Sequence, residues 1–168
     1  MANTTFSGPI RSESTIKTIS KDATSGTITE VTTLGGAPVS LSDGNVTLTN
    51  ATHSGRVLLV PDGGQDNTYT LPAPIAGSMF RFVYAGGAAD ATDALIITPG
   101  NSNFYIGGIT HLDTNADNVT VFSDGNSNSS IQLNVPQAFD ITIVGKDTTN
   151  YQIFGTVTST TVPAFADQ

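Results

Sequence analysis

The stretch TYTLPAPIAGSMFRFVYAG, residues 68–86, decides the class of fold. Its second half alternates, with Phe80, Phe82 and Tyr84 at every second position. Alternate side chains of a strand point to the same face, so this segment predicts a β-strand with one aromatic face. The prolines and the glycine of the preceding loop end one strand and separate it from the next. The pattern is typical of β-structure.

The same texture continues on both sides of this stretch, as short apolar segments between turns rich in Gly, Pro, Asn and Asp. No segment has helical periodicity longer than two turns, which excludes a parallel βαβ fold. The spacing of strands and turns predicts an all-β fold, a small antiparallel β-barrel or sandwich. The expected strands cover residues 56–60, 68–71, 79–84, 94–98, 104–106, 109–112, 118–122, 130–135, 139–144 and 151–157.

Four regions follow from the changes in composition along the chain. Residues 1–14 are expected to form an extended N-terminal arm and residues 15–53 a β-hairpin region. Residues 54–157 form the barrel or sandwich module, and residues 158–168 a C-terminal tail.

Within the hairpin region, a Gly-terminated turn at 21–26 predicts a first hairpin. The Asp43-Gly44 turn between residues 39–41 and 46–49 predicts a second. In the tail, Pro163 and Phe165 are candidate docking points.

The composition excludes several classes of protein. Among 168 residues there are 14 acidic and 6 basic side chains, a net charge of −8, and the cations are scattered. An acidic surface repels phosphate backbones, so nucleic acid is not an expected partner. The longest apolar runs are far shorter than a membrane span, so no membrane is expected either. The absence of cysteine excludes disulfides and a thiol nucleophile.

No set of residues predicts catalysis. His53 and His111, the two histidines, lie in no nucleophile or zinc-binding pattern, and we interpret each as a solvent-exposed or hydrogen-bonded structural residue. Oxygen-rich turns such as 124–128 bind calcium in some proteins, but turn formation is the interpretation chosen here. The chain has no Trp to line a sugar-cleaving cleft. We therefore expect no enzyme, no cofactor and no metal.

The N-terminus and three stretches of the module together carry a family resemblance. MANTTFSGPIRSES at 1–14, followed by a Thr-rich hairpin, resembles the opening of small structural proteins of marine tailed phages, including cyanophages. Residues 68–86, with 94–109 (ALIITPGNSNFYIGGI) and 139–157 (FDITIVGKDTTNYQIFGTV), are similar to a β-barrel module common in phage decoration and fibre proteins. Tyr151 stands where that module often carries Trp. The chain thus resembles the tailed-phage capsid decoration, or cement, proteins.

The resemblance implies a virion protein that is made in the host cytoplasm and stabilises the outer surface of the phage head as a homotrimer. Its partners would be the major capsid protein and its own copies. The arm would bind the capsid through Phe6, Pro9, Ile10 and Arg11. Phe6 and Ile10 would lie about 13 Å apart on one side of an extended segment. Arg11 would pair with a capsid carboxylate.

Other interpretations stay open. The arm is alternatively a disordered terminus with no role. A phage fibre or receptor-binding protein, using the same module to bind a host glycan, is the alternative function. A secreted carbohydrate-processing enzyme is a third, which the absent secretory signal and catalytic set disfavour.

Overall fold

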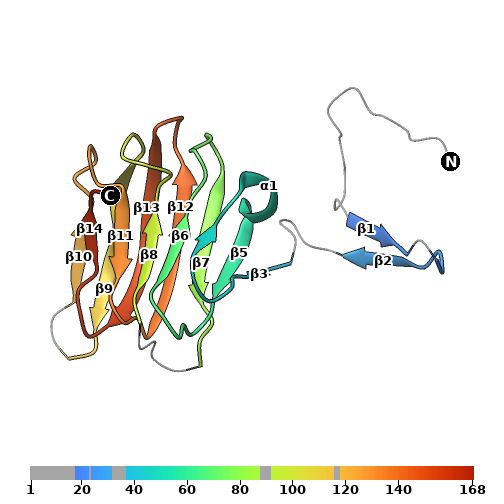
Figure 1. The fold of residues 1–168 in the computed structure, drawn as a ribbon, viewed down its shortest axis with the longest axis horizontal. Coiled ribbons are helices and arrows are strands. Elements are labelled where there is room, and N and C mark those ends of the chain that lie inside the picture. Colours follow the sequence, from blue (N-terminus) through green and yellow to red (C-terminus); the bar gives the residue numbers. More distant parts are fainter. Residues whose placement is uncertain (1–17, 23, 32–36, 88–91, 116–117) are drawn as a thin grey trace. The chain divides into compact units, whose positions relative to one another are not determined.

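The chain divides into two compact units, Met1–Gly36 and Ala37–Gln168, which are described in turn. Figure 1 shows the computed structural model as a ribbon. The structure describes residues 18–22, 24–31, 37–87, 92–115 and 118–168.

The described part of the first unit is a β-hairpin. Strands β1 (Thr18–Lys21) and β2 (Ile28–Val31) pair antiparallel in full register. In the turn between them, the Asp22 carboxylate accepts a hydrogen bond from the Ser25 amide at 2.6 Å, and Gly26 takes a φ of 71° that favours glycine. The first hairpin predicted from the sequence is confirmed.

The second unit consists of two β-sheets packed face to face, which confirms the all-β sandwich. In the described residues one sheet has seven strands in the order β10-β9-β13-β12-β7-β5-β3, and the other has five in the order β14-β11-β8-β6-β4. No closed barrel forms among these residues, because each sheet keeps two edges.

The bounds of the elements are as follows. The seven-stranded sheet contains β3 (Val39–Ser40), β5 (Arg56–Val60), β7 (Met79–Tyr84), β9 (Phe104–Asp113), β10 (Val119–Phe122), β12 (Ala138–Gly145) and β13 (Asn150–Ser159). The five-stranded sheet contains β4 (Val46–Thr47), β6 (Asn67–Thr70), β8 (Ala94–Ile97), β11 (Ser130–Leu133) and β14 (Ala164–Ala166). A single-turn helix, α1 (Asn50–His53), connects β4 to β5.

From β3 to β8 the chain crosses from one sheet to the other after every strand. As a result β3, β5 and β7 pair parallel in one sheet, and β4, β6 and β8 pair parallel in the other. The remaining strands add antiparallel pairs, such as β12 with β7 and with β13, and one further parallel pair, β13 with β9. The sheets are therefore mixed, where the sequence predicted antiparallel pairing.

The second predicted hairpin is wrong. Strands β3 and β4 flank the Asp43-Gly44 turn as expected, but they belong to different sheets. The turn is an arch that connects the two sheets. A residue outside the turn holds it, because the Gly44 amide donates to the side chain of the buried Asn67 at 2.5 Å. Gly44 has a φ of 100°, which suits an arch as well as a hairpin turn. Burial of Leu41 and Leu48 between the sheets offsets the cost of separating the two strands.

Two predicted boundaries also move. Strands β3 and β4 lie within the expected hairpin region 15–53, yet they pair with β5 and β6, so the sandwich begins at Ala37 and not at residue 54. The expected tail 158–168 contains β14, which pairs with β11. Pro163 is buried and the Phe165 ring packs on Tyr105 at a centroid distance of 6.1 Å, so both expected docking points make contact with the sandwich.

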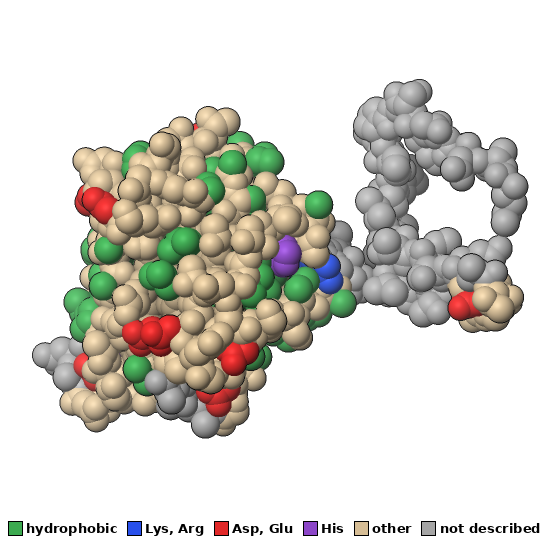
Figure 2. Space-filling view, in the orientation of Figure 1, with side chains coloured by type: hydrophobic (Ala, Val, Ile, Leu, Met, Phe, Trp, Pro, Cys, Tyr) green, Lys and Arg blue, Asp and Glu red, His purple; other side chains and the backbone are tan. Residues whose placement is uncertain are grey.

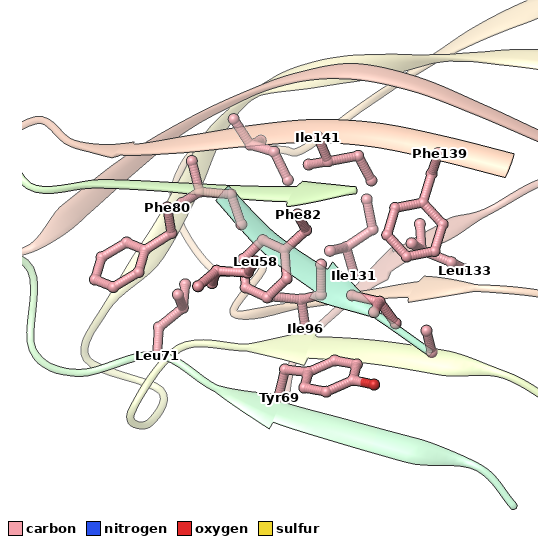
Figure 3. Close-up of a cluster of buried hydrophobic side chains, with 14 of the residues drawn as sticks. Leu58, Tyr69, Leu71, Phe80, Phe82, Ile96, Ile131, Leu133, Phe139 and Ile141 are labelled. Atoms are coloured by element: carbon pink, nitrogen blue, oxygen red, sulfur yellow. The ribbon is translucent and has the colours of Figure 1, made fainter. Parts of the chain in front are cut away.

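The core lies between the two sheets, where alternate residues of facing strands meet (Figure 3). The aromatic face predicted for residues 79–84 points into it, with Phe80 and Phe82 fully buried and Tyr84 packed at its margin. Phe80 meets Tyr151 edge-on, and Phe82 meets Tyr69. Figure 3 shows Leu58, Phe80, Phe82, Phe139 and Ile141 from one sheet facing Tyr69, Ile96, Ile131 and Leu133 from the other, with Leu71 beside them.

Candidate functional site

The predicted capsid-binding residues Phe6, Pro9, Ile10 and Arg11 lie outside the described residues. Their role stays a prediction.

Both histidines are hydrogen-bonded, as predicted, but only one is at the surface. His53 ends α1, and its Nδ1 accepts from the Thr49 amide at 2.9 Å. His111 on β9 is completely buried, with Nε2 at 3.0 Å from the Ser159 hydroxyl and 3.2 Å from the Ser159 carbonyl oxygen. Its Nδ1 has no partner in the described structure. His111 therefore acts as an interior polar residue.

The oxygen-rich turn 124–128 uses its carboxylate to hold its own backbone. Asp124 accepts from the amides of Asn126, Ser127 and Asn128 at 3.0–3.1 Å. The Ser127 hydroxyl donates to it at 2.6 Å, and these bonds lower the pKa of the carboxyl, the side-chain bond most. This geometry is that of a turn-forming aspartate. Among the described residues, no group of three or more His, Asp or Glu side chains could hold a metal ion.

The outer face of the seven-stranded sheet carries a shallow groove of about 550 Å³ where β7, β12 and β13 lie side by side. Cross-strand register brings the lining together, since Arg81 pairs with Thr142 and Thr142 pairs with Phe154. The groove is lined by Met79, Arg81, Asp140, Thr142, Phe154, Gly155 and Thr156.

A two-point ion pair forms the polar part of this groove. Arg81 donates from Nε to one Asp140 oxygen at 2.8 Å and from Nη2 to the other at 2.5 Å. These hydrogen bonds lower the pKa of Asp140, which partial burial opposes, and raise the pKa of Arg81. The two side chains are 46% and 43% exposed, so both can still contact a ligand.

The apolar part of the groove consists of exposed side chains on a face that points to solvent. Phe154 is 50% exposed and Met79 is 38% exposed. Between Phe154 and Thr156, Gly155 has a φ of 149°, and a Cβ there would lie 2.2 Å from the Asp140 carbonyl oxygen. Position 155 therefore requires glycine, and the backbone of Gly155 lines the groove beside Phe154.

A second exposed aromatic side chain lies further along the same face. Phe122 on β10 is 69% exposed and pairs with Gly108 on β9. Its ring leans over that glycine, since a Cβ on Gly108 would lie 2.8 Å from Phe122 Cδ1. Because Ile153 on β13 pairs with Gly107, Phe154 follows at the level of Gly108. Phe122 and Phe154 thus flank β9 at one level of the sheet. Their Cα atoms are about 10 Å apart, which is two strand spacings.

Sequence reasoning did not identify this groove. The alternation of residues 79–84 places Met79 and Arg81 on the outward face, and the structure confirms that part. The partner Asp140 is 59 residues away, so its position depends on which strands pair. The exposed aromatics were detectable only as Phe residues out of phase with the buried positions of their own strands, as Phe154 is between Tyr151, Ile153 and Val157.

No family model matches the chain, and a search of curated proteins gives no match. In the described part of the chain, no helix has the length and apolar character needed to cross a membrane.

Proposed function

We propose that this chain is a capsid decoration protein of a tailed phage, which binds the outside of the head as a homotrimer and stabilises it. The observation that carries the proposal is the division of the chain into a small N-terminal unit, Met1–Gly36, and a densely packed sandwich. A small unit joined to a larger folded body suits an anchor and the body it attaches. The family resemblance of the sequence supports the same role.

Exposed sheet edges support the trimer. Within the described residues, strands β3 and β10 are the edges of the seven-stranded sheet, and β4 and β14 are the edges of the five-stranded sheet. Unpaired edge groups favour association with another strand. Native mass measurement of the purified protein should give three copies. A stable monomer at micromolar concentration, with no trimer on particles, would reject this part of the proposal.

Capsid attachment is tested with the arm. Phe6→Ala with Ile10→Ala removes two apolar side chains whose burial would contribute about 3–5 kcal/mol before the arm's ordering entropy is subtracted. We expect the double variant to require at least tenfold more protein to saturate particles that lack this chain. The matched control is Ser7→Ala with Ser12→Ala, which changes the same arm without removing apolar surface.

Occupancy is measured by cryo-electron microscopy of the particles. Density of the wild-type protein on the head supports the function, and density at the tail tip would instead favour the fibre or receptor-binding alternative. Saturation by the Phe6/Ile10 variant at the wild-type concentration would show that the arm is not the anchor.

A further inference from the structure

The groove on the seven-stranded sheet joins an apolar surface to a ready set of hydrogen-bonding groups. Phe154 and Met79 supply the first, and the Arg81–Asp140 pair supplies the second. We propose that this groove binds a neutral oligosaccharide, with one sugar ring stacked on Phe154 and its hydroxyls hydrogen-bonded to Arg81 and Asp140. This site goes beyond the capsid-binding function and does not depend on it.

The apolar part fits one face of a sugar ring. A pyranose carries C–H groups on its faces and hydroxyls around its rim. The negative face of an aromatic ring attracts the positively polarised hydrogens of such C–H groups. Half of the Phe154 surface is exposed, and the bare backbone of Gly155 lies next to it, so a flat ring can approach without displacing a side chain.

The polar part has hydrogen-bonding capacity left over. A guanidinium has five N–H donors and a carboxylate has about four acceptor positions. Two bonds join Arg81 to Asp140, so donors and acceptors of both groups stay available toward the groove. A sugar hydroxyl needs both, because it accepts from one neighbour and donates to another. The hydroxyl-bearing side chains of Thr142 and Thr156 line the same groove.

Charge selects a neutral ligand. The positive charge of Arg81 is already matched by Asp140, and the chain as a whole carries −8. A sialylated or phosphorylated ligand would meet no free cation among the lining residues and would be repelled by the overall field.

The second aromatic side chain extends the site beyond one sugar. Phe122 lies on the same face as Phe154, about 10 Å away across β9. Gly108 on β9, between them, has no side chain, and the Phe122 ring leans over it. An oligosaccharide running across β13, β9 and β10 would contact both rings, which a monosaccharide cannot do.

A second copy of this chain suits the face less well. The exposed rings on it have threonines as neighbours, Thr110, Thr142 and Thr156 among them. The buried centre of a protein interface is more continuous and more apolar. Self-association through this face is therefore treated as an outcome of the test.

The test uses the purified full-length chain without capsids, so its failure is independent of the arm experiments. Maltohexaose, cellohexaose and mannohexaose are the probes, and sialyllactose is the charged comparison. Binding is followed by calorimetry and by backbone amide NMR shifts. We expect at least one neutral hexasaccharide to bind at millimolar concentration or below, with shifts on β7, β12 and β13, and with little dependence on salt.

Variants assign the binding to the groove. Phe154→Ala and Asp140→Asn should each weaken binding about tenfold, a change of about 1.4 kcal/mol. Phe122→Ala should weaken a hexasaccharide more than a disaccharide. Val162→Ala is the matched control, because Val162 is 45% exposed but does not line the groove, and it should bind as the wild type does.

Three results would overturn the proposal. One is the absence of groove shifts with every neutral probe while the spectrum stays folded. Another is tighter binding of sialyllactose than of the neutral probes. The third is a Phe154→Ala variant that binds sugars normally but loses self-association or particle binding, which would assign the face to a protein partner.

Discussion

At the level of single residues, polar side chains in this protein mostly hold turns and strands in place. Asp22, Asp124 and Asp147 each accept hydrogen bonds from backbone amides located two to four positions further along the chain. Asp140 accepts two hydrogen bonds from Arg81. In all four cases the bonds to the ionised form lower the pKa of the carboxyl in the folded chain.

These carboxylates should make the protein sensitive to acid. A folded pKa below the unfolded value contributes stability that is present above about pH 4 and is lost as pH falls through the folded pKa. Urea unfolding at neutral pH and at pH 3 should show lower stability in acid. Asp140→Asn should reduce that difference, although the pair is exposed and contributes at most about 1 kcal/mol. An unchanged acid dependence in Asp140→Asn would contradict the assignment.

The buried histidine gives a second prediction. His111→Ala removes a fully buried ring and leaves the Ser159 hydroxyl without that partner, so it should lower the free energy of unfolding by about 2–4 kcal/mol. His53→Ala is the control. Its ring is partly exposed and makes local contacts around α1, and the expected loss is about 1 kcal/mol or less. Chemical denaturation measures both. Equal effects would mean that burial of His111 matters little.

Among the strands, the sequence predicts local features better than pairing. The alternation of Phe80, Phe82 and Tyr84 is enough to orient β7, because side-chain direction depends only on the strand itself. The Asp43-Gly44 turn was misread as a hairpin, since its arch geometry depends on Asn67, 23 residues further along. Strand β14 was missed for a similar reason: its three residues become a strand only beside β11. To predict the groove, one would have to know both the direction of side chains on each strand and the pairing of the strands.

Strand β13 provides the prediction at this scale. Gly155→Ala would place a Cβ 2.2 Å from the carbonyl oxygen of Asp140 on β12, at a φ that strains other residues. We expect a loss of about 3 kcal/mol or more in unfolding free energy. Gly87→Ala is the matched control, because nothing lies within 4 Å of the new Cβ and its φ is ordinary. Thermal and urea unfolding compare them, and similar midpoints would argue against a tight β12–β13 contact.

The whole molecule separates into an N-terminal unit and a sandwich with its own core. Where the structure describes burial, every residue of the buried hydrophobic cluster lies between Leu41 and Val157. The acidic and apolar side chains that Figure 2 shows on the sandwich surface are dispersed among polar ones. Such a body meets the requirements of an independently folding domain.

Removal of residues 1–36 should therefore leave a folded sandwich. We expect the melting temperature of the 37–168 fragment to stay within about 3 °C of the full chain, since all the core residues found in the described part of the chain are kept. Circular dichroism and Tyr fluorescence follow the transition. A fragment that fails to fold would mean that the first unit contributes to the sandwich core.

The back-and-forth winding from β3 to β8 has a mechanical consequence. Strands β3 and β4 form one side of the sandwich, and β10 and β14 border the opposite side (Figure 1). Tension between Ala37 and Gln168 would therefore pull across the strands and peel them from the edge, which breaks ladder hydrogen bonds one after another. The first part of the chain to detach would be β3 from one sheet and β4 from the other. Strands β5 and β6 would then be the new edges. Stretching the protein between these two residues should give a series of small unfolding steps, and in each step both sheets lose a strand.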